Sequence, residues 1–345
     1  MDRYRARPRM AAILGLVPAL VLAACGGTAT GGDATPAPSG AVSGEIFVSG
    51  SSTVEPITNR VAEAFAADHP DFTYTVEGPG TGDGFARFCN GETDISDASR
   101  PISEDEAAAC AEAGVEYVEL VVAYDGLSVI TSAENAGVDC LSFLDLYALL
   151  GPESEGFERW SDADQLAAEL DAELGGAFGA SHAPYPDAPL IVTAPGEESG
   201  TFDSFVEIVI APIAEERGAD ETTRPDYTAS ANDNAIVEGI GGAASSLGWV
   251  GLAFAEQAQG VKSVEIDAGD GCVAPGDATV ADGSYPISRP LFIYPSLGAA
   301  AENPVVEPFV DFYLSAEGLA LAGEVGYVPL TDAQAEASRT VWEGR

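Results

Sequence analysis

The chain has 345 residues, of which 46% are hydrophobic, so it can bury a substantial core and is not intrinsically disordered. Its 14 lysine and arginine residues stand against 56 aspartate and glutamate residues. This balance excludes binding to nucleic acids or anionic membrane surfaces through charge, because the field of the chain repels phosphate backbones.

Residues 1–24 have the features of an export signal. Four arginines, at positions 3, 5, 7 and 9, precede an apolar stretch (11–23) that is too short to span a bilayer as a stable helix. The sequence Leu22-Ala23-Ala24-Cys25 resembles a bacterial lipobox, in which the cysteine is lipidated (palmitate) and becomes the mature N-terminus. An ordinary signal peptide with an incidental cysteine is the alternative. Cys25 begins a tether to residue 44 that is rich in Gly, Pro, Ala and Ser. Without residues 1–24, 10 basic and 55 acidic side chains remain, a net charge of −45.

A turn rich in hydroxyl groups separates the first predicted strand and helix. Residues 45–48 predict an apolar strand, and apolar residues recur at helical spacing over 54–65. Ser51, Ser52 and Thr53 lie between them. Such a turn can bind an anion, because the unpaired N–H groups and the positive end of a helix dipole point the same way. A plain helix N-cap is the alternative interpretation.

Strands and helices alternate through the first half of the chain. We expect strands over 72–76, from 93, and over 117–122 and 127–131, with helices after the glycine-rich turn 77–84 and over 104–113. The last two strands are expected to be broken at Asp125-Gly126. The order predicts a largely parallel sheet.

The second half repeats the opening design. The strand 190–193 leads through a glycine to Ser199, Gly200 and Thr201, and a helix follows to about residue 218. Further expected elements are helices over 141–150, 165–174, 234–240, 305–314, 317–325 and 332–342, strands over 247–254 and 261–266, and an extended run over 285–294. Two such turns suggest two half-sites on two lobes.

Four cysteines remain after Cys25, an even number that favours disulfides in an exported chain. Three connectivities are possible. We expect Cys89 to pair locally with Cys110, and Cys140 with Cys272. A metal site is a poor alternative, because the chain has no CxxC spacing and only two histidines.

Four segments together resemble the PstS-like phosphate-binding lipoproteins of ABC importers: 50–57, 94–102, 199–203 and 285–292, in family order from about residue 44 to about 330. The resemblance implies a type II periplasmic-binding-protein fold, an α/β fold of two lobes joined by two crossovers. Lobe 1 would comprise 45–122 and 287–345, and lobe 2 would comprise 123–286. One phosphate would bind in the cleft between them, without a cofactor or metal.

The resemblance also implies a set of ligand-binding residues. The predicted phosphate-binding residues are Ser51, Ser52, Thr53, Thr81, Ser99, Arg100, Asp125, Ser199, Gly200 and Thr201. Many relatives have an arginine shortly before Ser199, which this chain lacks, so Arg100 is the expected source of charge and Arg289 the second candidate. Enterobacterial members have an aspartate where this chain has Ser99. Asp125, then Asp97, are candidates to accept the proton that phosphate carries and sulfate lacks.

The implied partners are ABC permease subunits and, through lipid on Cys25, the extracytoplasmic face of a bacterial cell membrane, with the protein a monomer. Another oxyanion, such as sulfate or molybdate, or a phosphate-sensing role, is the alternative. A serine hydrolase using Ser199 is disfavoured, because the glycine pattern departs from G-x-S-x-G and His69 and His182 read as surface residues.

Overall fold

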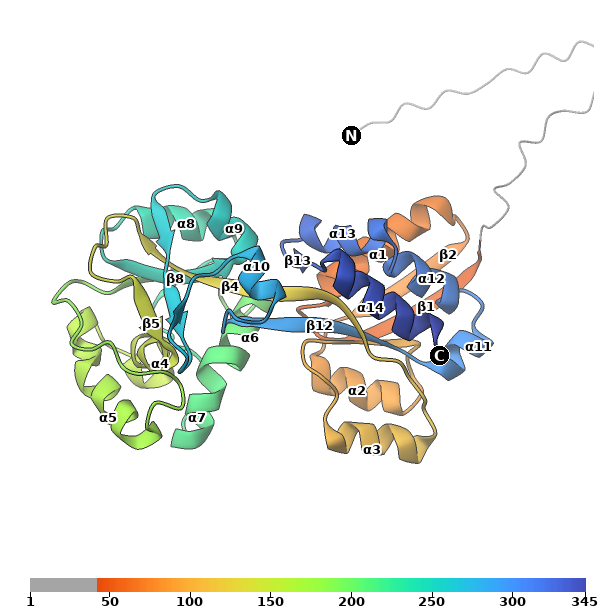
Figure 1. Ribbon diagram of the computed structural model, residues 1–345, viewed down its shortest axis with the longest axis horizontal. Coiled ribbons are helices and arrows are strands. Elements are labelled where there is room, and N and C mark those ends of the chain that lie inside the picture. Colours follow the sequence, from red (N-terminus) through yellow and green to blue (C-terminus); the bar gives the residue numbers. More distant parts are fainter. Residues whose placement is uncertain (1–41) are drawn as a thin grey trace, which may run out of the picture. The chain divides into compact units, whose positions relative to one another are not determined.

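The computed structural model describes residues 42–345, which contain two large hydrophobic cores and two smaller clusters (Figure 1). The predicted export signal, Cys25 and the tether up to residue 41 lie outside the described residues. No helix within 42–345 combines the length and the apolar character needed to cross a membrane.

The first core is built from both ends of the described chain. Its buried apolar side chains include Ile46, Val61 and Phe309. The elements of this half are β1 (Gly44–Gly50), α1 (Glu55–Asp68), β2 (Phe72–Glu77), α2 (Thr81–Cys89), β3 (Ile95–Ala98), α3 (Glu104–Ala113), α11 (Leu297–Glu302), α12 (Val306–Tyr313), α13 (Ala316–Glu324), β13 (Val328–Pro329) and α14 (Asp332–Glu343).

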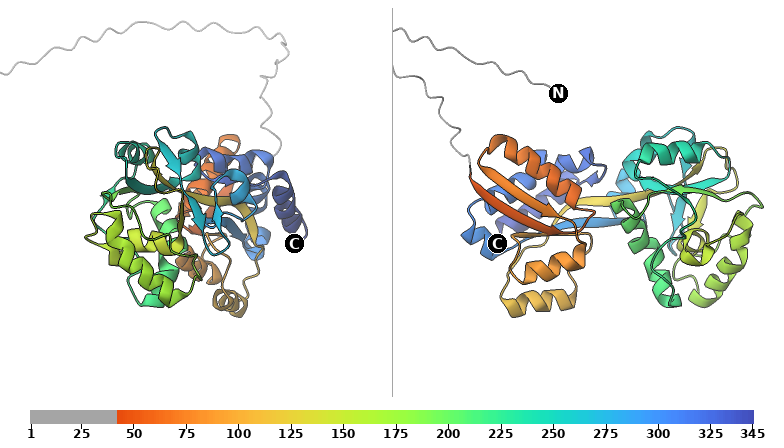
Figure 2. Two further views of the ribbon diagram at one scale, coloured as in Figure 1. Left: turned by 60° about the vertical axis from the view of Figure 1, so that its left-hand side comes forward. Right: turned by 180° about the vertical axis from the view of Figure 1, so that it is seen from behind.

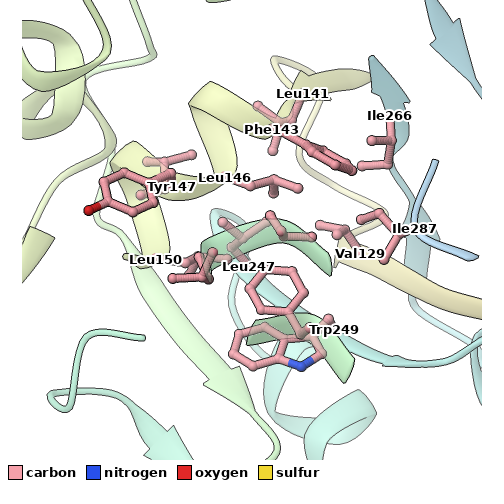
Figure 3. Packing of buried hydrophobic residues seen from close by; sticks show 14 of the residues in the cluster. Val129, Leu141, Phe143, Leu146, Tyr147, Leu150, Leu247, Trp249, Ile266 and Ile287 are labelled. Atoms are coloured by element: carbon pink, nitrogen blue, oxygen red, sulfur yellow. The ribbon is translucent and has the colours of Figure 1, made fainter. Parts of the chain in front are cut away.

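The second core is built from the middle of the chain, and α4 is its centre. Every residue of α4 is buried, and all of them except Asp145 are apolar or aromatic. Figure 3 shows Leu146 and Leu150 of this helix packed near Leu247 and Trp249. The elements are β5 (Cys140–Ser142), α4 (Phe143–Leu150), α5 (Asp164–Leu174), β6 (Ile191–Ala194), α6 (Gly200–Phe205), a π-helical stretch (Val206–Ile210), α7 (Ala211–Arg217), β7 (Thr228–Ala229), α8 (Asp233–Gly241), β8 (Ser246–Gly251), α9 (Leu252–Gln257), β9 (Val261–Ser263), β10 (Glu265–Asp267), β11 (Cys272–Val273) and α10 (Asp277–Ala281).

Two long strands, β4 (Leu120–Ser132) and β12 (Ser288–Pro295), belong to both halves. They pair antiparallel with each other, and Figure 2 shows them side by side. Residues at the start of β4 lie in the first core and residues near its end lie in the second. Two α/β halves joined by two crossing strands match the predicted architecture. The lobe boundaries 45–122 with 287–345, and 123–286, stay a prediction.

The sheet is mixed, which corrects the expectation of a largely parallel one. Its strand order is β2-β1-β3-β12-β4-β8-β6-β7, with β9 and β13 also paired to β4. The pairs β1–β2 and β1–β3 are parallel as predicted, and β6–β8 is also parallel. Both crossing strands, however, run antiparallel to their neighbours.

The predicted break at Asp125-Gly126 was wrong, because β4 continues through it. Aspartate and glycine are typical of turns, which is why the sequence predicts a strand end there. In the structure Arg289 and Ser288 of β12 lie opposite Asp125 and Gly126, so the partner strand supplies the pairing that local propensity disfavours. The predicted strand 247–254 is likewise too long, because it ends at Gly251 and α9 begins.

Both disulfides join the expected cysteines. Cys89 at the end of α2 bonds to Cys110 in α3, and Cys140 in β5 bonds to Cys272 in β11. The first disulfide closes a local loop of 21 residues, whereas the second spans 132 residues. A disulfide that closes a longer loop restricts the unfolded chain more than one that closes a shorter loop.

Candidate ligand-binding site

The hydroxyl-rich turn between β1 and α1 begins at Ser51, whose carbonyl oxygen accepts hydrogen bonds from the amides of Val54 and Glu55. α1 begins at Glu55, and no side chain hydrogen-bonds to its first N–H groups. Ser51 points inward, since its Oγ accepts a hydrogen bond from the Thr53 amide at 3.2 Å. Ser51 therefore fits the N-cap interpretation, because its Oγ accepts a hydrogen bond from the amide two residues further on. The Ser52 and Thr53 hydroxyls, in contrast, contact other groups.

Ser52 and Thr53 contact α6. The Ser52 hydroxyl donates to Asp203 Oδ2 at 2.9 Å, and the Thr53 and Ser204 hydroxyls lie 3.4 Å apart. A Cβ atom on Gly200 would lie 3.6 Å from both the Ser52 carbonyl and Thr53 Cα. The structure thus brings the two serine- and threonine-rich turns together, although they are about 150 residues apart in sequence.

Ser199, Gly200 and Thr201 lie at the start of α6. Ser199 caps this helix, because its Oγ accepts a hydrogen bond from the Thr201 amide at 3.2 Å. The Asp203 carboxylate and the Ser204 hydroxyl, further along the helix, make the contacts with the first half-site. Ser204 is fully buried, whereas Ser199 and Thr201 are partly exposed.

Arg289 in β12 lies at the centre of this contact. Its Nη2 donates to Ser204 Oγ at 2.8 Å and to Thr53 Oγ1 at 3.3 Å. Its Nε lies 3.6 Å from Asp125 Oδ2, which also accepts a hydrogen bond from Ser204 at 2.6 Å. Nη1 pairs with Glu207. One guanidinium therefore joins hydroxyls from both half-sites to a buried carboxylate.

This cluster is well shielded from solvent. The side chains of Arg289 and Asp125 are 12% and 5% exposed. Burial raises the pKa of Asp125, although Arg289 and Ser204 oppose the shift. Among the described residues, Arg289 Nε has no hydrogen-bond partner. A buried donor of this kind is usually satisfied, so the site can accommodate an acceptor such as an oxyanion.

A cleft of about 660 Å³ lies beside the cluster. Arg289 and Glu207 line it, together with Thr81 and Ser99 from the first half. The hydroxyls of Thr81 and Ser99 are 3.1 Å apart, and both residues are buried. The lining of the cleft thus combines hydroxyl donors with guanidinium groups and with carboxylates.

Arg100 also lines the cleft but is engaged elsewhere. Its two terminal nitrogens form a bidentate pair with Glu106, both at 2.8 Å, and its guanidinium carbon lies 5.8 Å from the Phe85 ring centre. Its side chain is 44% exposed. Its role as the main source of charge stays a prediction, but the structure places Arg289 directly among the hydroxyl groups.

Neither candidate proton acceptor lines the cleft itself, but Asp125 contacts Arg289, which does, whereas Asp97 lies among residues of the first half. Asp97 Oδ1 accepts a hydrogen bond from Thr58 in α1 at 3.0 Å, and the Thr58 hydroxyl lies 3.1 Å from that of Tyr313. Its side chain is fully buried, and burial raises the pKa of Asp97 to about 8. This carboxyl is part of the first core.

The histidines do not assemble a catalytic triad with Ser199. His69 Nδ1 accepts a hydrogen bond from the Val42 amide, and His182 Nδ1 bonds to Asp145. Ser199 serves as a helix cap. The arrangement that a serine hydrolase needs is therefore not built from these residues.

The sequence analysis missed three residues of this cluster: Asp203, Ser204 and Glu207. The sequence does contain one indication that Ser204 belongs to the cluster. Ser204 lies four residues after Gly200, so the two share a helical face once the segment is recognised as a helix. Its contact with Arg289 depended on a strand pairing that the sequence does not reveal.

Comparison with known proteins places the chain among binding proteins. The sequence profile of the PBP superfamily domain matches residues 35–317. Protein SphX of Synechocystis is 37% identical over 290 residues, covering 83% of this chain and 79% of that protein. The phosphate-binding protein PstS of Staphylococcus epidermidis is 33% identical over 313 residues, covering 90% and 85%.

A similar structure supports this placement. It is the crystal structure of a possible phosphate binding protein from Planctomyces limnophilus, with a TM-score of 0.74 and 36% sequence identity. The match covers 87% of this chain and 98% of that protein.

Proposed function

Because the chain belongs to the PBP superfamily and, within it, to the PstS-like phosphate-binding proteins, we propose that it captures inorganic phosphate in the cleft beside Arg289. Proteins of this family bind and transport their ligand without chemical conversion, so the chain is not an enzyme. The observation that carries the proposal is the cluster in which Arg289 joins Thr53, Ser204 and Asp125.

These groups match the chemistry of phosphate. A guanidinium forms charge-assisted hydrogen bonds with oxyanions, roughly twice as strong as neutral ones. Hydroxyls from both half-sites add neutral donors at short range. In the structure these donors bond to one another, and phosphate would exchange those contacts for bonds to its own oxygens.

Asp125 is the proposed determinant of selectivity. At neutral pH phosphate carries one or two protons, whereas sulfate carries none. A carboxylate in the site accepts a hydrogen bond from a protonated phosphate oxygen, but it repels sulfate. The proposed set retains Ser51, Ser52, Thr53, Thr81, Ser99, Arg100, Asp125, Ser199, Gly200 and Thr201, and adds Ser204 and Arg289.

The strongly acidic composition does not conflict with anion binding. Surface charges further away than about 8 Å are screened at physiological salt. Buried donors act at a shorter range and in a lower effective dielectric. The net charge therefore slows the approach of phosphate more than it weakens the bound state.

We further propose that lipid on Cys25 anchors the protein to the extracytoplasmic face of the membrane, where it delivers phosphate to an ABC permease. The lipobox and the family relation support this role. Metabolic labelling with a palmitate analogue tests the anchor: the wild-type chain should incorporate label and Cys25→Ser should not. Equal labelling of both would refute it.

Calorimetric titration of the chain with phosphate tests the binding function. One phosphate should bind per chain. Saturable binding of molybdate or sulfate, with no response to phosphate, would instead support the alternative of another oxyanion.

A further inference from the structure

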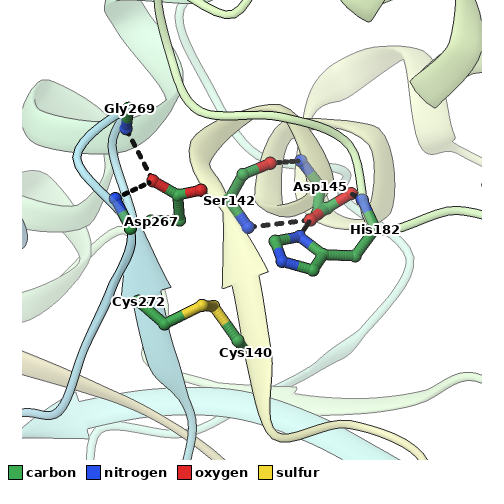
Figure 4. Close-up of a disulfide and its surroundings, with 8 residues drawn as sticks. Cys140, Ser142, Asp145, His182, Asp267, Gly269 and Cys272 are labelled. Carbon is green, nitrogen blue, oxygen red and sulfur yellow. Dashed lines mark hydrogen bonds and ion pairs between the residues drawn. A yellow bond between two sulfur atoms is a disulfide. The ribbon is translucent and has the colours of Figure 1, made fainter.

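The disulfide between Cys140 and Cys272 adjoins a histidine that the phosphate proposal does not use. The two sulfur atoms and one imidazole nitrogen of His182 lie within 4.8 Å of one another. The three residues come from separate segments: β5, β11, and the stretch between α5 and β6. Figure 4 shows the imidazole on the side of the disulfide where Asp145 also lies.

Asp145 fixes the orientation of this imidazole. Its side chain is fully buried, and its Oδ2 lies 2.6 Å from His182 Nδ1. The same carboxylate accepts hydrogen bonds from the amides of Ser142 and His182 and from the hydroxyls of Ser181 and Tyr185. Surrounded by donors, the carboxylate acts as acceptor, so Nδ1 donates. The other ring nitrogen, Nε2, then presents its lone pair away from Asp145.

A histidine held in this way is typical of metal sites. Metal-binding imidazoles almost always donate their other N–H to a carboxylate or carbonyl, which fixes the tautomer. Two thiolates and one imidazole are also a ligand set that zinc prefers. We propose that, when its disulfide is reduced, the chain binds a zinc-like divalent cation through Cys140, Cys272 and His182, with Asp145 as the positioning residue.

Reduction and metal binding are two separate steps, and atoms, electrons and protons balance in each. A dithiol reductant transfers two electrons and two protons, so the S–S bond breaks, two thiols form, and the reductant becomes a disulfide. The cation then replaces the two thiol protons, which are released to solvent. Water completes the coordination at a fourth position.

The geometry requires only small movements. Zinc–sulfur bonds of about 2.3 Å in a tetrahedron place two sulfurs about 3.8 Å apart. The Cα atoms of Cys140 and Cys272 are 6.0 Å apart, so rotation of the side chains can open the sulfurs to that separation. Asp267 Oδ1 accepts hydrogen bonds from the amides of Gly269 and Gly271, which fixes the turn that carries Cys272 (Figure 4).

Reductant and cation can both reach this cluster. Cys272 and His182 are exposed and Cys140 is partly exposed. Cys89 and Cys110, in contrast, are 4% and 0% exposed. The strongly negative field of the chain also attracts cations. The disulfide and the cation are thus alternative cross-links between β5 and β11, one oxidised and one reduced.

Cobalt absorption tests the site, because thiolate ligands give Co²⁺ a charge-transfer band that water does not. The full chain, with Cys25→Ser so that this thiol does not contribute, is titrated with Co²⁺ before and after reduction by a phosphine. We expect one Co²⁺ per chain after reduction, displaced by Zn²⁺, and no such band before it. Absence of the band after reduction would overturn the proposal, as would unfolding on reduction seen by circular dichroism.

Matched variants assign the ligands. His182→Gln should weaken Co²⁺ binding at least tenfold, and Cys140→Ser/Cys272→Ser should abolish the band. Cys89→Ser/Cys110→Ser, which removes the other disulfide, should retain it. Unchanged affinity in His182→Gln, or a band that disappears only with Cys89 and Cys110, would overturn the assignment. Each readout is independent of phosphate binding.

Discussion

Replacing Arg289 by glutamine removes the only guanidinium that, in the described part of the chain, bonds to hydroxyls of both half-sites. The side chain is 12% exposed, so solvent compensates little for its loss. Glutamine keeps a polar amide of shorter reach. The substitution therefore tests the contribution of charge at this position.

The magnitude follows from the contacts. A hydrogen bond to a charged group contributes about 1.5–3 kcal/mol. If phosphate loses one or two such bonds, its binding free energy falls by about 3 kcal/mol, which is more than a hundredfold in Kd. Asp125 would add repulsion, because its nearest positive charge, now 3.6 Å away, would be gone.

Calorimetric titration with phosphate measures the effect. Arg87→Gln is the matched control, since Arg87 is 41% exposed and pairs with Glu77 outside the cleft. We expect its Kd to remain within about twofold of the wild type. Phosphate affinity within threefold of the wild type in Arg289→Gln, together with a large loss in Arg100→Gln, would refute the central role of Arg289.

Three further results are expected. As pH rises from about 4 to about 8, the stability of Asp97→Asn relative to the wild type should increase by about 1.4 kcal/mol per pH unit. In that range Asp97 is ionised in the unfolded wild type, but it keeps its proton in the folded protein, where its pKa is raised to about 8. The stability of the wild type therefore falls as pH rises, whereas that of the variant has no such dependence. Urea unfolding of both proteins at several pH values measures this, and a difference independent of pH would contradict it. Gly84→Ala should destabilise the folded protein by about 1–3 kcal/mol or more, because the added Cβ would lie 2.3 Å from Gly50 Cα. In the control Gly298→Ala, in α11, the added Cβ would lie 3.6 Å from its nearest neighbour, so this variant should be neutral or stabilising. Equal melting temperatures of the two variants would argue against this packing. The association rate of phosphate should rise as the salt concentration increases from 10 to 150 mM, because salt screens the negative field of the protein. Association rates measured by stopped flow that fall with salt would exclude such repulsion.

The sequence predicted local structure well where the signal was itself local. The strand, turn and helix over 45–65 were found because apolar periodicity and turn residues agree there. Both disulfides also followed from spacing and cysteine number. The family resemblance supplied the two-lobed fold, which periodicity alone could not.

The errors arose where distant pairing overrides local preference. Asp125 and Gly126 resemble a turn, but β12 pairs with them and keeps β4 continuous. The same pairing brings Arg289 opposite Asp125. The sequence favours Arg100 because this residue lies inside a recognised segment. The bidentate pair that Arg100 forms with Glu106 depends on side-chain geometry, which the sequence does not reveal.

Selective capture of phosphate is the central claim, and competition calorimetry tests it most directly. The chain is titrated with phosphate at neutral pH in the presence of an equal concentration of sulfate. We predict a phosphate affinity unchanged within twofold, because the proposed acceptor, the Asp125 carboxylate, would accept a hydrogen bond from protonated phosphate and repel sulfate. Displacement of phosphate by equimolar sulfate would contradict the account.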